Sequence, residues 1–140
     1  MTAVHLNDKD EVLFRQIHPS FIQDGEVSSQ PFVPTSQAFA PTPKDEGFLS
    51  VDRSSLTSAG ESFRLFTSNG HSSSAVYGVT VGEFSNEAIQ CIEAPITASE
   101  NQAANEAHAL ADYNPHKPGQ QKTKAKRLKQ RAIARGRLHP

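Results

Sequence analysis

The charged residues of this 140-residue chain are sorted into two segments. Nine of its fourteen Lys and Arg residues lie from Lys117 onward, whereas all fifteen Asp and Glu residues lie at or before Asp112. Residues 1–116 therefore carry five positive and fifteen negative charges, and residues 117–140 carry nine positive charges and no negative one. This division predicts an acidic folded body followed by a cationic segment with a role of its own.

The cationic segment has the pattern of a helix. Residues 121–135 are mostly strong helix formers, and Gly136 is expected to end the helix. Ala125, Leu128 and Ala132 form a single apolar stripe. Because this stripe is thin, we expect packing alone to hold the helix poorly.

A helix of this charge density is typical of segments that neutralise nucleic-acid phosphates and release counterions. No aromatic residue or base-reading motif is interleaved, so we expect electrostatic binding with little sequence preference. The predicted partner is nucleic acid, RNA or DNA, or an acidic protein surface. Alternatively, the arm lies on the acidic body of its own chain or of a second copy in a homodimer. The predicted contacts are Lys122, Lys124, Lys126, Arg127, Lys129, Arg131, Arg135 and Arg137. We expect no membrane partner, because the arm lacks the large apolar side chains that interfacial helices bury.

Alternation of bulky and small residues predicts the strands. In residues 75–84, Tyr77, Val79 and Val81 alternate with Gly78, Thr80 and Gly82, which places the bulky side chains on one sheet face. Shorter strands are expected at residues 11–18, 48–51, 89–92 and 108–113.

One helix is predicted outside the basic arm, from an N-cap at Ser54 or Ser55 to about Thr67, ended by Asn69-Gly70. Together these elements predict an α+β fold in which a small, mostly antiparallel sheet of four or five strands packs one helix, followed by the basic C-terminal helix. The predicted domain plan is a flexible N-terminus at 1–10, the α+β domain at 11–113 and the basic helical arm at 117–140.

Residues 28–43 contain a tandem duplication, because Ser29–Thr35 (SQPFVPT) is followed by Ser36–Thr42 (SQAFAPT). Four prolines fix the backbone of this stretch in extended conformations, and Phe32 and Phe39 would pin it to the body. Because added length costs little in a surface loop, we predict a proline-rich surface loop here.

An alternative function is enzymatic. Arg15, His18, Asp52 and Glu83 are the candidate catalytic residues, because such side chains hold a nucleotide phosphate and move a proton. This alternative is a small nucleotide-using enzyme, of transferase or nuclease type, from a bacterial toxin or defence system. An Arg on a strand, a downstream segment that contains Ser, and Glu83 resemble the Arg…Ser…Glu layout of ADP-ribosyltransferases in single residues only, since a Ser-Thr-Ser triplet and a Glu-X-Glu pair are absent. The structural alternative is that Arg15 is bonded by a nearby acid such as Asp52.

Several classes of protein are excluded by what the sequence lacks. Cys91 is the single cysteine, so we expect no disulfide framework, a cytoplasmic location and an inert core thiol. No apolar run resembles an export signal or approaches the roughly 20 residues of a membrane span. The six histidines show no paired ligand spacing, so we expect no metal and no cofactor. His108 and Asp112 are about 13 Å apart if they lie on one strand, which is too far for an acid-base pair.

Overall fold

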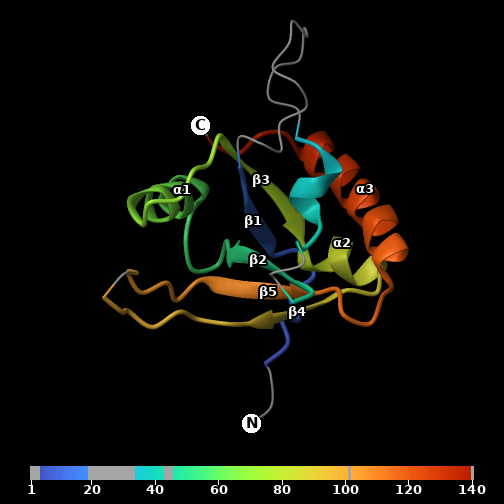
Figure 1. Ribbon diagram of the computed structural model, residues 1–140, viewed down its shortest axis with the longest axis horizontal. Helices are drawn as coiled ribbons and strands as arrows, with labels where there is room; N and C mark the ends of the chain where they lie inside the picture. The colour runs from blue at the N-terminus through green and yellow to red at the C-terminus, as the bar shows by residue number, and fades with distance from the viewer. Residues whose placement is uncertain (1–3, 19–33, 43–45, 101, 140) are drawn as a thin grey trace, which may run out of the picture.

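The computed structural model describes residues 4–18, 34–42, 46–100 and 102–139, and its centre is a five-stranded antiparallel sheet (Figure 1). The strand order is β3-β1-β2-β5-β4. The strands are β1 (Val12–Ile17), β2 (Phe48–Arg53), β3 (Ala75–Thr80), β4 (Gln90–Glu93) and β5 (His108–Asp112). The helices are α1 (Ala59–Ser68), α2 (Val81–Asn86), α3 (Pro118–Arg135) and the 3-10 turn η2 (Ser36–Phe39). The predicted α+β class, with an antiparallel sheet and a C-terminal helix, is confirmed.

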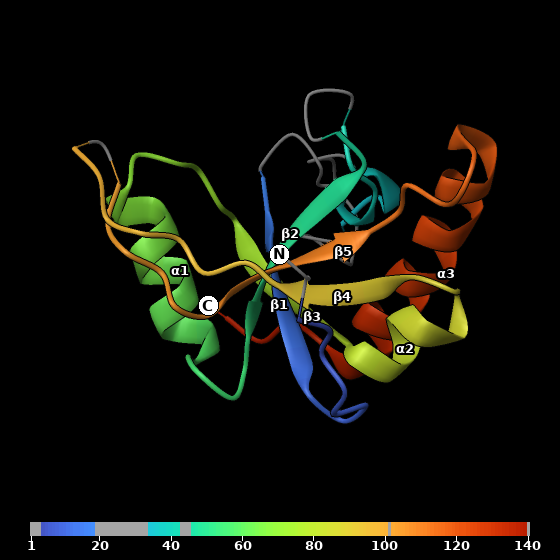
Figure 2. The same ribbon diagram turned by 90° about the horizontal axis from the view of Figure 1, so that it is seen from below.

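The two faces of the sheet are covered differently (Figures 1 and 2). Helix α3, η2 and α2 gather on one side, and α1 lies on the other. Alternate strand residues on the α3 side, among them Leu13, Leu49 and Val79, are buried in the main core together with Tyr113, which directly follows β5. The hydrophobic core therefore lies between the sheet and α3, and the α1 side is where polar side chains gather.

Helix α3 is part of the core. It begins at Pro118, a little earlier than predicted, and the positive φ of Gly136 (97°) ends it where the sequence predicts. Ala125, Leu128 and Ala132 are each exposed by 1% or less. The whole predicted stripe is therefore buried, and ion pairs of Arg127 and Arg135 also hold the helix. That packing alone would hold it poorly stays a prediction.

The residues after α3 cover the open edge of β3. The amide of Leu138 donates to the carbonyl of Val76 (2.8 Å), and the amide of Val76 donates to the carbonyl of His139 (2.6 Å). The imidazole of His139 then packs on Phe63 of α1, with ring centroids 4.9 Å apart. An exposed strand edge is a template for pairing with other chains, and this segment occupies it.

The strand predicted over residues 75–84 ends at Thr80, because α2 begins there. The Thr80 hydroxyl accepts from the amide of Glu83 (3.0 Å), and the Glu83 carboxylate accepts from the amide of Thr80 (2.9 Å). This capping box starts a helix at Val81. The alternating pattern continued past Thr80 in the sequence, but the local capping interaction decided the conformation.

Helix α1 is capped by Ser58, whose hydroxyl accepts from the amide of Glu61 at 3.1 Å. The predicted caps Ser54 and Ser55 are wrong, because these two serines bond other segments: Ser54 Oγ accepts from the amide of Val12, and Ser55 bonds the Glu11 carboxylate. The predicted end at Asn69-Gly70 is confirmed, with Gly70 at φ 89°.

The second copy of the duplicated heptapeptide is not a surface loop. Residues 36–39 form η2, and Ala38 and Phe39 are fully buried. The Tyr113 hydroxyl donates a hydrogen bond to the carbonyl of Phe39. The surface-loop prediction is therefore wrong for this copy, because Phe39 fills the core between the sheet and α3. Most of the first copy, including Phe32, lies outside the described residues.

Within the described residues, no helix combines the length and the apolar character that crossing a bilayer requires.

Candidate functional site

The basic residues of α3 fall on two flanks of the helix, one of which faces α2. On this flank Arg127 forms an ion pair with Glu87 (2.9 Å), and the ammonium of Lys124 donates to the Glu87 carbonyl (2.6 Å). Further along, Arg135 forms an ion pair with Glu83 (3.0 Å). The positive charge of Arg131 also acts on Glu83. The acidic residues of α2 and its C-terminal end thus engage the cations of this flank.

The opposite flank carries Lys122, Lys126 and Lys129, which lie four and then three residues apart and therefore share one side of the helix. Lys122 and Lys126 are exposed, and Lys129 is half-buried. No ion pair joins these three lysines to any residue in the described ranges. We call this set the lysine flank.

A groove of about 800 Å³ borders the lysine flank. Lys122 and Lys126 line it from α3, Gln37 lines it from η2, and Asn114 lines it from the turn before α3. These side chains supply two cations and two amides to one concave surface. Arg137, beyond the helix, lies close enough to Tyr77 to act electrostatically on its phenol.

The four predicted catalytic residues are distributed over the molecule. Arg15 and Asp52 line the same cavity, on the sheet near α1. His18 is exposed after the end of β1, and Glu83 belongs to the contact between α2 and α3; neither lines that cavity. The guanidinium of Arg15 donates to the carbonyls of Ala38 (2.7 Å) and Ser50 (3.1 Å).

The cavity that contains Asp52 has a volume of about 280 Å³. Its floor is a row of residues directly opposite one another on three strands: Phe14 on β1, Asp52 on β2 and His108 on β5. Phe66 of α1 lines one wall, and residues of the β4–β5 connection, among them Asn105, line another. We call this the α1-face cavity.

Among the described residues, Asp52 is the only Asp or Glu that lines the α1-face cavity, and it is held by two hydrogen bonds. The hydroxyl of Ser62 donates to one carboxylate oxygen (2.6 Å), and the amide of Asn105 donates to the other (2.9 Å). Gln16 donates to the Ser62 hydroxyl (2.8 Å) and accepts from Ser73 (2.8 Å). Ser62 is 1% exposed, so the Asp52 carboxylate is held by one buried hydroxyl and one amide, each on a different oxygen.

Two histidines complete the lining of the α1-face cavity. His71 stacks on Phe66, with ring centroids 4.8 Å apart and planes 29° apart. His108 places Nδ1 2.7 Å from the carbonyl oxygen of Ala94. A carbonyl oxygen only accepts, so Nδ1 carries the proton, and in the neutral ring Nε2 is an acceptor.

Sequence reasoning missed Ser62, His71, Asn105 and His108 as lining or supporting residues. They come from α1, the loop before β3, the β4–β5 connection and β5, and no local motif joins them. No sequence signal joins His108 to Asp52; the strand register of the folded protein places the two directly opposite each other. The acid beside His108 is therefore Asp52 on the neighbouring strand, and not Asp112 on the same strand.

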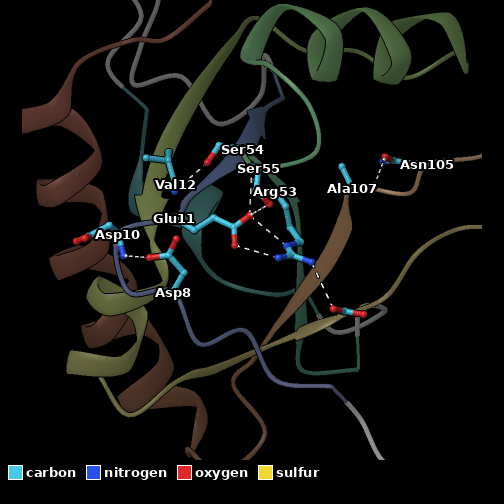
Figure 3. A network of polar contacts seen from close by, with 10 residues as sticks. Asp8, Asp10, Glu11, Val12, Arg53, Ser54, Ser55, Asn105 and Ala107 are labelled. Carbon is cyan, nitrogen blue, oxygen red and sulfur yellow. Dashed lines mark hydrogen bonds and ion pairs between the residues drawn. The ribbon is translucent and has the colours of Figure 1, made fainter.

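A second polar cluster joins the N-terminal segment to β2 (Figure 3). The Glu11 carboxylate accepts from Nε and Nη2 of the Arg53 guanidinium (3.1 and 3.2 Å) and from the Ser55 hydroxyl (2.5 Å). Arg53 also reaches Glu93 of β4 (3.4 Å). Glu11 is only 5% exposed, so its ion pair with Arg53 is largely buried. Through Arg53 the cluster connects the N-terminal segment, β2 and β4.

No family model, curated protein or solved structure matches this chain. In the described part of the chain, no group of three or more His, Cys, Asp or Glu residues is placed to hold a metal ion.

Proposed function

We propose that this α+β protein is a non-enzymatic binding protein that uses the lysine flank of α3 to engage a polyanion. Nucleic acid is the favoured partner, and an acidic protein surface is the alternative that the experiment below separates from it. The proposal deepens what the charge distribution of the sequence predicts, because it names the side of the helix that does the binding.

The observation that carries the proposal is that, among the described residues, only one flank of α3 forms ion pairs. Of the eight predicted contact residues, Arg127 and Arg135 form ion pairs with carboxylates of the described residues. Lys122, Lys126 and Lys129 form none there, although α2 offers acids on the other flank of the same helix. Cations that have no ion pair with the described residues and lie beside a groove are what a phosphate backbone neutralises with release of counterions.

The rigidity of the helix supports the same function. The three lysines span two turns, roughly 10 Å along the axis at 1.5 Å per residue. Because Ala125, Leu128 and Ala132 are buried against the sheet, the lysines are presented on a fixed frame rather than on a flexible tail. Lysine acts as a point charge, so the binding would be largely indifferent to base sequence.

The test is a fluorescence-anisotropy titration of a labelled 20-nucleotide single-stranded RNA, the same DNA sequence and a labelled polyglutamate peptide. Three phosphate contacts predict that nucleic-acid affinity falls roughly 20-fold between 50 and 200 mM salt. The variant Lys122→Gln/Lys126→Gln would retain one contact, so its affinity would be much weaker and would fall only about threefold over that range. Tighter binding of polyglutamate than of either nucleic acid would assign the flank to an acidic protein instead.

The matched control is Lys9→Gln/Arg64→Gln, which removes two exposed positive charges away from α3. We expect it to bind as the wild type does. Equal loss in both double variants would show that only net charge matters, and an unchanged affinity in Lys122→Gln/Lys126→Gln would overturn the proposal.

The enzymatic alternative stays a prediction. Arg15 and Asp52 share a cavity, but His18 and Glu83 do not line it. The change Arg15→Ala/His18→Ala tests it: a folded variant whose activity in cells is unchanged would dispose of a nucleotide-using enzyme. Since Arg15 donates to two backbone carbonyls, folding must be checked first by circular dichroism.

A further inference from the structure

We propose that the α1-face cavity binds a small planar nitrogen cation, of the guanidinium or amidinium class. The inference does not rest on the lysine flank, because α1 and α3 lie on opposite sides of the sheet (Figure 2). It rests on which polar atoms the cavity offers, on its size and on the rings that line it.

The floor of the cavity offers hydrogen-bond acceptors side by side. An ionised carboxylate has about four lone-pair sites, and the contacts from Ser62 and Asn105 use one on each oxygen of Asp52. His108, directly opposite Asp52, has its Nδ1 proton committed to the Ala94 carbonyl, which leaves Nε2 as an acceptor in the neutral ring. A ligand that meets these two residues must therefore bring N–H donors.

Three of the side chains around the cavity use donors within the protein, while Asn69, His71 and Gln102 also line it. The side-chain amide of Asn105 donates to Asp52, and that of Gln16 donates to Ser62. Within the part of the chain that the structure describes, Arg15 is the only Lys or Arg in the lining, and two backbone carbonyls already accept from its guanidinium. An anion would be repelled by the Asp52 charge, whereas a cation finds a carboxylate that Ser62 and Asn105 hold in place.

The volume of the cavity and the aromatic rings that line it favour a small, flat ligand. A volume of about 280 Å³ is at the lower end for small-molecule sites, which run from roughly 300 to 1,000 Å³. Phe14, Leu65 and Phe66 give the lining an apolar part, and aromatic faces attract delocalised cations. A guanidinium or amidinium group is planar and makes two parallel N–H···O bonds to one carboxylate, which a compact ammonium does not.

The test measures binding of two probes, benzamidine and agmatine, by ¹H–¹⁵N chemical-shift titration of the full chain. We expect both to shift amides of residues that line the cavity, Asp52 and His108 among them. Benzamide and benzoate, which have the shape of benzamidine without its positive charge, should bind at least tenfold more weakly, because they lack the charge-assisted pair of donors. Probes that shift amides elsewhere, or bind no better than benzamide, would overturn the inference.

Two variants test whether binding needs the Asp52 carboxylate and the open volume of the α1-face cavity. Asp52→Asn should weaken benzamidine binding about tenfold or more, while the matched control Asp112→Asn, on β5 but outside the lining, should bind as the wild type does. Because Asp52 also bonds Ser62 and Asn105, its replacement is paired with Ile96→Trp, which fills space at the lining and leaves these three side chains in place. Ile96 bonds Asn105 through backbone groups, which the substitution keeps. Unchanged affinity in a folded Ile96→Trp variant would place the probe elsewhere and refute the assignment.

Discussion

Arg135, in the last turn of α3, donates to both carboxylate oxygens of Glu83, in the first turn of α2, at 3.0 Å each. The same guanidinium donates to the carbonyl of Gly78 at 2.8 Å. Burial by itself raises the pKa of Glu83, but hydrogen bonds from Arg135 and the Thr80 amide, with the charges of Arg135 and Arg131, lower it below its usual value of 4.5. One side chain thus fastens the basic helix to α2 and to β3, and it is a structural cation rather than a free one.

A double-mutant cycle measures this ion pair. Glu83→Gln, Arg135→Gln and the double variant should give a coupling free energy of about 1 kcal/mol in urea unfolding, since both side chains keep part of their surface in water. The exposed pair Glu61 and Arg64 is the control and should show no measurable coupling. Equal coupling in the two cycles would contradict the assignment of Arg135 to the fold.

The buried pair of Glu11 and Arg53 should matter more. Arg53→Met leaves the Glu11 carboxylate, whose side chain is 3% exposed, without its cation. We expect the free energy of unfolding to fall by about 2 to 3 kcal/mol, somewhat below the range for a fully buried pair because Arg53 is 19% exposed. Arg64→Met, at an exposed position, is the control. If Arg53→Met lowers the free energy of unfolding no more than this control does, the cluster in Figure 3 does not stabilise the fold.

Acid should destabilise the protein through Glu11 and Glu83. Burial opposes ionisation of Glu11, but hydrogen bonds from Arg53 and Ser55 and the charge of Arg53 hold its pKa below the usual 4.5. A carboxyl with a lowered folded-state pKa contributes its full stability above its unfolded pKa and loses it as the pH falls through the folded value. Urea unfolding at pH 6 and pH 3 should therefore show a smaller loss in Glu11→Gln/Glu83→Gln than in the wild type. Equal losses would show that other carboxyls control acid stability.

Cys91 should be unreactive in the folded protein. Burial, together with the charge of Glu11, raises the pKa of its thiol to about 12, and the residue is 3% exposed. Because the thiolate is the reactive form, labelling with a disulfide reagent at pH 8 should proceed only as fast as the chain unfolds. Arg53→Met should label faster than the wild type, and unfolded protein in urea should label at once. Fast labelling of the stable wild type would mean that the thiol is accessible.

The sequence predicts elements well where a local signal is strong and unopposed. Short apolar runs predict strands at residues 11–18, 48–51 and 108–113, and the structure has strands at Val12–Ile17, Phe48–Arg53 and His108–Asp112. Prediction failed at Thr80, where a capping box interrupted an alternating pattern, and at Phe39, where a proline-rich segment that looks like a loop supplies a core side chain. In both cases a contact that periodicity does not encode changed the outcome.

The candidate sites divide in the same way. The cationic character of α3 is visible in the sequence, but the split between a paired flank and a lysine flank depends on where α2 places Glu83 and Glu87. The α1-face cavity was visible only through Arg15 and Asp52, since its histidines come from segments far apart in the chain. No spacing rule brings His71 and His108 to one place.

The sequence by itself determined the class of fold, the helix that carries the positive charge and the residue that ends it, because hydrophobic periodicity, charge order and the conformational freedom of Gly136 are local properties. Only the tertiary structure decided which cations form ion pairs, which helices cover each face of the sheet and which polar groups meet around Asp52. Those facts depend on strand order and register, and these are set by the joint burial of side chains that are distant in the chain.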